Sequence, residues 1–424
     1  MRIALIAISN SVHAAKWISL IADQGWDLHL LSSIDFYGLH PLVRNITNWI
    51  SGPFVRWPGI YGDVHDREYP PPPRSRAALR SVLRHWPWQG DFTRYALKKM
   101  MPVATDRVQW ATDIIRMIEP DIVHSMEFQH GGALALEVKQ RFGPGFPKWI
   151  VTNWGSDVYL YGRLAQHRDI VRRILQNCDY YSCECERDVA LARSFGLQGK
   201  VLPVVPNAGG LDIHRLSFFR QPGSSSSRRV IAVKGYHWTM HRAQVALRAI
   251  EMCADVLKGY QVKVYSPMPR YMTDLQAKLI AQSTGLDIEL MTQVSHHEML
   301  TLHGQARISI SLSISDGLCT SFTEALAMGS FPIQSATACA DEWITDGVSG
   351  FLVPAEEPEI IAERLRRAVL DDALVDRAAE INAEIAATRL DHRRIRDIVI
   401  HDYYEYVFGD RGWSDGPSSL DIAS

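Results

Sequence analysis

Short apolar runs alternate with helical patterns along most of the chain, and these runs fall into two sets. The first set begins with "RIALIAIS" and ends with "VLPVVPN"; the second begins with "VIAVKG" and ends with "GFLVP". Apolar runs that are bounded by turn residues and separated by helices are typical of parallel strands buried on both faces. The chain is therefore predicted to be an α/β protein with two doubly wound, Rossmann-like parallel-sheet domains.

A polar, serine-rich break, "RQPGSSSSRR" at residues 220–229, separates the two sets and predicts a flexible linker. The closing "GPSSLDIAS" predicts a disordered tail. We expect, in chain order, a first domain, a linker, a second domain, a last helix and a tail, at residues 1–214, 215–229, 230–390, 391–412 and 413–424.

Residues 40–105 depart from the alternating pattern, because they are rich in Arg, Trp and Pro and include a proline run that cannot lie inside a helix. We interpret them as an insertion between the second and third strands of the first domain. Two interpretations of its role stay open. It is a loop-and-helix excursion with arginine stems lying on the protein surface, or it is an acceptor-binding lobe or membrane-surface patch, since Trp and Arg suit interfaces.

Charge and hydropathy argue against some classes of function. The formal net charge of −2 gives no reason to expect a nucleic-acid partner. No uninterrupted apolar stretch reaches the ~18 residues that a membrane span needs. The opening "MRIALIAISNSVHAA" could pass for a short signal peptide, but its apolar run is brief and leads into a helical pattern, so a first buried strand is predicted.

The six cysteines are scattered through a chain too large to need disulfides, which favours a reduced, cytoplasmic protein. In "SCEC", Cys183 and Cys185 would lie on one face of a strand. A metal site would need two more ligands at suitable positions, and the sequence offers none. Both cysteines are therefore predicted to be small core residues, and no metal site is expected.

The stretch "SISDGLCTSFTEALAMG", residues 313–329, has the features of a binding site for a phosphate-bearing ligand. It begins at the carboxyl end of a predicted strand, where ligands bind in open α/β sheets. The glycine allows a tight turn and close backbone approach. The helix that follows would present backbone N–H groups to a phosphate. These are the N–H groups of Gly317, Leu318, Cys319 and Thr320.

Two carboxylates eight residues apart flank this turn. Asp316 could hold sugar hydroxyls, and Glu324 could accept hydrogen bonds from a ribose diol. The assembly suits a nucleoside diphosphate that carries a sugar. The alternative is that Asp316 merely caps a helix and Glu324 merely pairs with a basic residue.

This stretch, continued by "GSFPIQS" and "DEWITDGVSGFLVP", resembles the donor-site signature of glycosyltransferase family 4, one of the retaining group 1 glycosyltransferases. The family pattern is E-x(7)-E, and here Asp316 takes the place of the first Glu. The resemblance extends to "VVPNAGGLD" at 204–212 and "TNWGSDVY" at 152–159. It implies a GT-B fold, in which the two domains face a cleft and the last helix, 391–412, crosses back to the first domain.

The resemblance also implies an activity: transfer of a sugar, with retention, from a UDP-, GDP- or other nucleotide-diphosphate sugar to a hydroxyl acceptor. The acceptor would be a glycan, a lipid-linked saccharide or a small molecule, as in the biosynthesis of surface polysaccharides. The leaving diphosphate can itself take the acceptor's proton, so no strong protein base is required. No D-x-D pattern occurs in the chain, so neither a metal ion nor another cofactor is expected.

The chain departs from the family at its basic pair, which in the family holds the diphosphate. If Gly235 is aligned with the family glycine, Tyr236 and His241 take the positions of the usual Arg and Lys. The neighbouring Lys234 and Arg242 are predicted to supply the charge, with His241 as a protonated or neutral donor.

A second departure is Trp154, which stands where the family often has an active-site His. Asp157 remains, and it could hold an acceptor hydroxyl or cap a turn. The nucleotide base is predicted to contact the backbone around Val294 in "MTQVSHHEM", while His296 and His297 begin the next helix with Glu298.

The turn after the first strand, "SNSVH", has no G-x-G-x-x-G pattern, which counts against an NAD-dependent dehydrogenase. Ser11 and His13 could contact donor or acceptor; alternatively, Ser11 caps the helix and His13 faces solvent. Two other functions stay open: an inert nucleotide-sugar-binding homologue, and a nucleotide-sugar epimerase on the same scaffold. The expected location is the cytoplasm, with peripheral contact at the inner face of the membrane as an option.

Overall fold

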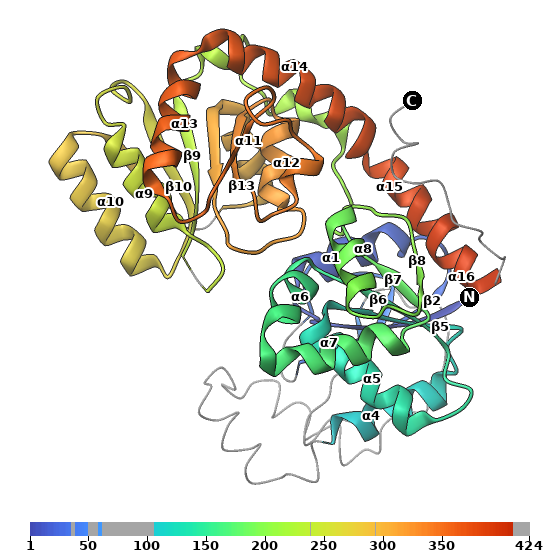
Figure 1. The fold of residues 1–424 in the computed structure, drawn as a ribbon. Coiled ribbons are helices and arrows are strands. Elements are labelled where there is room, and N and C mark those ends of the chain that lie inside the picture. The colour runs from blue at the N-terminus through green and yellow to red at the C-terminus, as the bar shows by residue number, and fades with distance from the viewer. Residues whose placement is uncertain (35–38, 50–57, 62–105, 238, 293, 410–424) are drawn as a thin grey trace, which may run out of the picture.

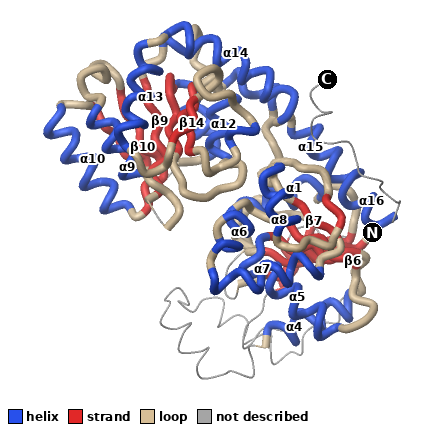
Figure 2. Tube along the Cα trace, in the orientation of Figure 1, coloured by secondary structure: helices blue, strands red, loops and turns tan. Residues whose placement is uncertain are grey.

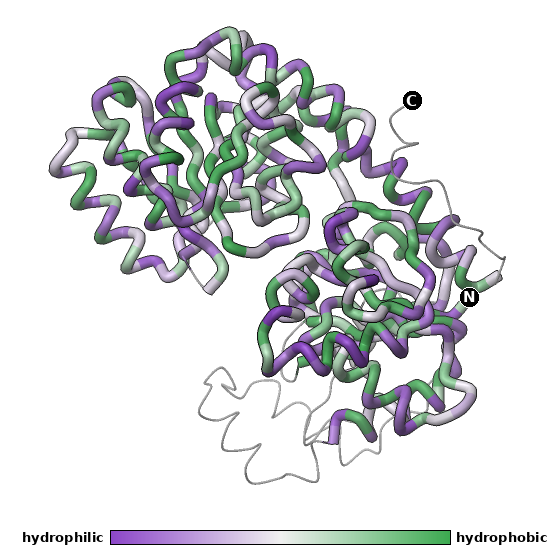
Figure 3. The backbone as a smooth tube through the Cα atoms, viewed as in Figure 1, coloured by the Kyte–Doolittle hydropathy of each residue, from purple (hydrophilic) through white to green (hydrophobic). Residues whose placement is uncertain are grey.

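The computed structural model describes residues 1–34, 39–49, 58–61, 106–237, 239–292 and 294–409. The chain forms two α/β domains, each built on one sheet with helices packed against it (Figures 1 and 2). This is the predicted architecture, and the apolar strand residues lie inside both domains, as Figure 3 shows.

The first domain has an eight-stranded sheet in the order β4-β3-β2-β1-β5-β6-β7-β8. Every adjacent pair is parallel except β3 with β4. The strands are β1 (Arg2–Ala7), β2 (Asp27–Ser32), β3 (Ile46–Trp49), β4 (Pro58–Tyr61), β5 (Ile122–Met126), β6 (Lys148–Thr152), β7 (Tyr180–Ser182) and β8 (Lys200–Val201). The helices are α1 (Val12–Ile21), α4 (Arg107–Ile118), α5 (Ala133–Phe142), α6 (Ser156–Tyr159), α7 (Ala165–Asn177) and α8 (Glu186–Ser194), with helical turns at Glu127–Gly132 and Tyr161–Arg163.

The second domain has a six-stranded, all-parallel sheet in the order β11-β10-β9-β12-β13-β14. Its strands are β9 (Val230–Tyr236), β10 (Gln261–Met268), β11 (Asp287–Met291), β12 (Ala306–Ser311), β13 (Phe331–Ser335) and β14 (Phe351–Val353). Its helices are α9 (Ala243–Met252), α10 (Arg270–Thr284), α11 (His296–Gln305), α12 (Thr320–Ala327), α13 (Pro358–Leu370) and α14 (Asp372–Arg389), with a helical turn at Ala340–Glu342.

The chain then runs from α14 through α15 (His392–Ile398) and a π-helical turn (Val399–Glu405) to α16 (Tyr406–Gly409), which lie along the first domain (Figure 1). Tyr404 accepts a hydrogen bond from Trp17 Nε1 at 3.0 Å. Val399 and Val407 are fully buried in one cluster with Ile3 of β1. The carboxyl end of the chain is therefore part of the first domain's core.

The serine-rich segment differs from the expected flexible linker. Helical turns form at Ile213–Phe218 and Ser225–Ser227. Ser225 is buried and donates to the Gly329 carbonyl at 2.7 Å, while Ser226 donates to the Asp376 carboxylate through both its N–H and its Oγ. Ser225 and Ser226 thus attach the segment to the second domain, while residues 221–224 are exposed.

Part of the predicted insertion belongs to the first sheet, because β3 pairs with β2 in parallel and β4 pairs with β3 in antiparallel register. Residues 62–105 and the predicted tail lie outside the described residues, so their proposed roles stay predictions. Within the described ranges, no helix is long and apolar enough to cross a membrane.

Cys183 and Cys185 are buried core residues, as predicted, but the expectation of a reduced protein is wrong for one pair of cysteines. A disulfide joins Cys185 in the first domain to Cys339 in the second, with Cα atoms 6.4 Å apart. The other four cysteines are free and buried. No local sequence pattern indicates this pairing, because the two residues are 154 positions apart.

Candidate functional site

The turn between β12 and α12 lies at the carboxyl edge of the second sheet, as predicted. Its backbone differs from the expected row of free amides. The N–H of Gly317 donates to Asp316 Oδ1 at 3.0 Å, and the N–H of Leu318 donates to Glu184 Oε2 of the first domain at 3.1 Å. Two of the four predicted phosphate-binding amides thus have carboxylate partners, while Cys319 and Thr320 begin α12.

Glu324 lies on α12, 4% exposed, and accepts a hydrogen bond from Nε2 of His296 at 2.9 Å. Burial by itself would raise the pKa of Glu324, but the His296 hydrogen bond and nearby positive charges outweigh it, and the pKa lies below its usual value. The second carboxylate is therefore held in its charged form. His296 begins α11, as predicted, and Ser295 and Glu298 cap that helix reciprocally.

Lys234 lies at the carboxyl end of β9, with Nζ 3.2 Å from Cys319 Sγ. Burial opposes its charge, yet the Cys319 sulfur and the Asp316 carboxylate together raise the pKa of Lys234 above its usual value. This lysine therefore supplies a permanent positive charge beside the turn. At Gly235 the backbone passes so close to β10 that a Cβ would lie 2.7 Å from the Tyr265 carbonyl oxygen, which accounts for glycine there.

The two other predicted basic residues are arranged differently. Arg242 is ion-paired with Glu356 at 2.8 Å and also donates to the carbonyls of Thr239 and His241. Burial, together with the charge of Lys234, lowers the pKa of His241 to about 4. The sequence left open whether His241 is protonated or neutral, and the lowered pKa indicates the neutral form. Lys234 supplies a positive charge beside Asp316.

At the first turn of the other domain, Ser11 caps α1 by accepting hydrogen bonds from the N–H groups of His13 and Ala14. The capping alternative is thus the observed one. His13 is solvent-accessible, and its ring lies 5.4 Å from that of Trp154. Desolvation lowers the pKa of His13, and Asp316 opposes that shift. The exposed His13 ring thus lies near enough to Asp316 of the second domain to interact with it electrostatically.

Asp157 lies buried in the first turn of α6, where Oδ2 accepts the N–H of Trp154 at 2.7 Å. Burial, followed by the charge of Glu127, raises the pKa of Asp157 to about 7. These contacts match the turn-capping alternative. Val294 is half-buried and packs against a hydrophobic cluster of the second domain that includes Ala232 and Tyr265.

Two glycines allow the domains to meet at this turn. Gly155 has φ +82°, and a Cβ on it would lie 2.0 Å from the backbone nitrogen of Gly317. Any side chain at position 155 would therefore force the domains apart. Both glycines stand in the motifs quoted from the sequence. Their contact could not be predicted from these motifs, because it depends on how the two domains pack.

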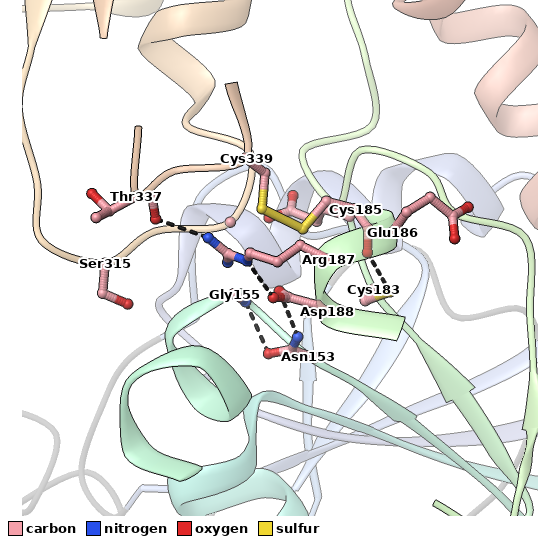
Figure 4. A network of polar contacts seen from close by, with 12 residues as sticks. Asn153, Gly155, Cys183, Cys185, Glu186, Arg187, Asp188, Ser315, Thr337 and Cys339 are labelled. Atoms are coloured by element: carbon pink, nitrogen blue, oxygen red, sulfur yellow. Dashed lines mark hydrogen bonds and ion pairs between the residues drawn. A yellow bond between two sulfur atoms is a disulfide. The ribbon is translucent and has the colours of Figure 1, made fainter. Parts of the chain in front are cut away.

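The segment Glu184–Asp188 of the first domain, of which only Cys185 was considered from the sequence, lies against this turn (Figure 4). Arg187 donates to the carbonyl oxygens of Asp316 and Thr337, and Glu342 accepts the N–H groups of Glu186 and Arg187. The sulfur atoms of Cys185 and Cys339 lie near the Asp188 carboxylate in a group of metal-ligand type, but these sulfur atoms are joined to each other.

A cavity of about 350 Å³ lies between the domains beside His296. Its lining includes basic side chains from both domains: Lys16, Arg215, His296, His297 and His392. A larger cavity of about 640 Å³ lies at the amino-terminal ends of β9, β10 and β11, on the opposite edge from Asp316. Since ligands bind at the carboxyl ends of parallel strands, the smaller cavity is the better candidate for a ligand.

Comparison with known proteins agrees with this geometry. Residues 273–384 match the family described as glycosyl transferases group 1. No curated protein matches the whole sequence at a significant level.

Solved structures resemble the fold over nearly its full length. Sucrose-phosphate synthase from Thermosynechococcus elongatus superposes with a TM-score of 0.64 at 14% identity, over 97% of this chain and 100% of that one. HepE from Anabaena, in complex with UDP and glucose, superposes with a TM-score of 0.65 at 12% identity, over 95% of this chain and 98% of that one. A glycosyltransferase from Rickettsia africae superposes with a TM-score of 0.62 at 13% identity, over 97% of this chain and 99% of that one. Residues 273–384 thus resemble the group 1 glycosyltransferases, and the fold of the chain is GT-B.

Proposed function

We propose that the protein is a retaining glycosyltransferase that moves a sugar from a nucleotide-diphosphate sugar to a hydroxyl acceptor in the cytoplasm. The observation that carries this proposal is that the Asp316 carboxylate interacts electrostatically with Lys234 of the second domain and with His13 of the first. A positive charge and an imidazole, one from each domain, thus lie near one carboxylate.

The donor's diphosphate would lie beside Lys234, because a fixed cation at that position stabilises the charge that develops on the leaving group. Asp316 would bind hydroxyls of the transferred sugar. The cavity beside His296 would take the nucleoside, with Glu324 accepting from the ribose diol and the backbone near Val294 touching the base. Support for a nucleotide-sugar donor comes from HepE, a structure of similar fold that has been solved with UDP and glucose.

In the reaction, the bond between the sugar's anomeric carbon and the diphosphate oxygen breaks, and a bond from that carbon to the acceptor oxygen forms on the same face. The acceptor's hydroxyl proton passes to the departing diphosphate. No buried carboxylate of the protein is then needed as the base, which suits the turn-capping contact of Asp157. The domains bring donor and acceptor together, which lowers the entropic cost of reaction.

A thermal-shift screen of the purified protein against UDP-, GDP-, dTDP- and ADP-sugars tests the donor part of this proposal. A ligand that binds only the native state raises Tm. We expect one nucleotide class to stabilise the wild type and not Glu324→Ala. If folded wild-type protein is stabilised by none of them, the donor proposal fails.

Turnover then separates the alternatives. Transfer to an acceptor, or donor hydrolysis above background, excludes the inert binding homologue. Chromatography of the nucleotide sugar after incubation detects an epimer, which would identify an epimerase instead.

A further inference from the structure

Arg187, in the first turn of α8, crosses from the first domain to two loops of the second. Its Nη2 donates to the Asp316 carbonyl oxygen at 2.9 Å, and its Nη1 donates to the Thr337 carbonyl oxygen at 2.8 Å. Figure 4 shows the side chain extended from its helix toward Thr337. One loop carries the candidate sugar-binding carboxylate, and the other follows β13.

The first domain holds this guanidinium in a fixed orientation. It stacks on the ring of Tyr159 at 4.0 Å, and its Nε donates to Asp188 Oδ1 at 2.9 Å. Asp188 is fully buried and is itself oriented by Asn153 Nδ2 at 2.9 Å. A planar guanidinium fixed on one edge offers its remaining N–H groups in a set direction, which a flexible ammonium does not.

The surrounding contacts make the joint between the domains specific. Glu184 accepts the N–H of Leu318 with Oε2 and that of Asn207 with Oε1. The backbone of Gly155 lies against Gly317 without room for a side chain. The turn that carries Asp316 thus contacts two separate parts of the first domain, Gly155 and the segment Glu184–Asp188, and Arg187 is the residue of that segment that donates a hydrogen bond to Asp316.

We propose that Arg187 is a positioning residue for the transfer reaction. By bonding the Asp316 and Thr337 carbonyls, it fixes the sugar-binding turn against the first domain, so that donor and acceptor meet in register. This inference rests on the proposed function. The groups proposed to bind the donor, Lys234, Asp316 and Glu324, all belong to the second domain. The contacts between the domains are therefore assigned to the chemical step and not to donor binding.

Steady-state kinetics of donor turnover in Arg187→Ala, Arg187→Lys and Arg163→Ala tests the role. Arg163 is a matched control, because it is exposed and its guanidinium stacks on the same Tyr159 ring at 4.1 Å. We expect Arg187→Ala to lower kcat by about 10- to 100-fold with little change in the donor KM, as for a misaligned reactant pair. Arg187→Lys should recover only a small part of the lost kcat, and Arg163→Ala should have the kcat of the wild type.

A kcat in Arg187→Ala within twofold of that in Arg163→Ala would overturn the proposal, as would a loss that appears only in the donor KM. Full recovery by Arg187→Lys would show that charge alone matters and would overturn the positioning role. Circular dichroism and Tm of all three variants establish that each is folded.

A second readout does not depend on sugar transfer. The reduced protein is treated with oxidised glutathione, and the Cys185–Cys339 disulfide forms as two protein thiols are oxidised and the glutathione disulfide is reduced to two thiols. We expect Arg187→Ala to slow this cross-link relative to Arg163→Ala, because the domains are held together less firmly. An unchanged rate of disulfide formation would contradict the positioning role. A slowed rate in a protein with no donor turnover would contradict only the proposed function.

Discussion

Nε2 of His296 donates a hydrogen bond to the buried carboxylate of Glu324 at 2.9 Å, joining the start of α11 to the middle of α12. The imidazole is half-exposed and lines the cavity between the domains, whereas the carboxylate is almost fully buried. His296 therefore links the carboxylate proposed to bind ribose with the space proposed for the nucleoside.

Removal of the imidazole in His296→Ala should raise the donor dissociation constant by about tenfold, since a hydrogen bond to a charged group contributes roughly 1.5–3 kcal/mol. Calorimetric titration with the donor found in the thermal-shift screen measures this dissociation constant. His401→Ala is the matched control, because that imidazole also bonds a carboxylate, that of Glu405 at 2.8 Å, but does not line this cavity. Equal losses in the two variants would contradict a role for the pair in donor binding.

Loss of the positive charge in Lys234→Ala should lower kcat/KM by roughly 10²- to 10³-fold, the range seen when a pre-organised group that stabilises the leaving charge is removed. Lys258→Ala, an exposed lysine remote from Asp316, serves as the control and should leave the rate unchanged. Wild-type rates in Lys234→Ala would show that the diphosphate lies elsewhere.

A metal ion is not expected to take part in transfer. Lys234 supplies a positive charge beside Asp316, and no D-x-D pattern occurs in the sequence. Donor turnover should therefore be the same before and after dialysis against EDTA. A loss that Mg²⁺ or Mn²⁺ restores would disprove this expectation.

Stability should depend on pH through Glu184. Burial raises the pKa of this carboxyl to about 8, against the opposing hydrogen bonds from Asn207 and Leu318. Because the folded state holds the proton more tightly than the unfolded state, stability from this group is complete below about pH 4.5 and is lost as the pH rises through about 8.

The Tm of the wild type should thus fall between pH 6 and pH 9 more steeply than that of Glu184→Gln, which cannot ionise. Glu186→Gln changes the exposed neighbouring glutamate and should behave as the wild type. The same pH slope in all three proteins would contradict the assigned pKa.

Thiol counting tests the link between the domains. Denatured protein alkylated without reductant should carry four labels, and protein reduced first should carry six, because only Cys185 and Cys339 are joined. Intact mass spectrometry reads both numbers. Six labels without reductant would mean that the pair is reduced in the isolated protein.

Local sequence patterns were enough to predict the elements and the turn of the candidate site. "RIALIA" forms the buried strand β1, and "SDGLCTSFTEALA" forms a turn that carries Asp316 and a helix that carries Glu324. Both follow from local rules: apolar runs form strands, glycine permits the turn, and residues of one helix lie near the turn that precedes it.

Contacts between groups of the two domains could not be predicted from the sequence and became known from the folded structure. Glu184 reaches Leu318 over 134 positions, Arg187 reaches Asp316 over 129, and Cys185 reaches Cys339 over 154. The tertiary structure likewise decided that His241 is neutral and that Lys234 is the charged group beside Asp316. The physical reason is that periodicity and capping act within a few residues, whereas burial, pKa and long-range hydrogen bonds depend on which surfaces the two sheets bring into contact.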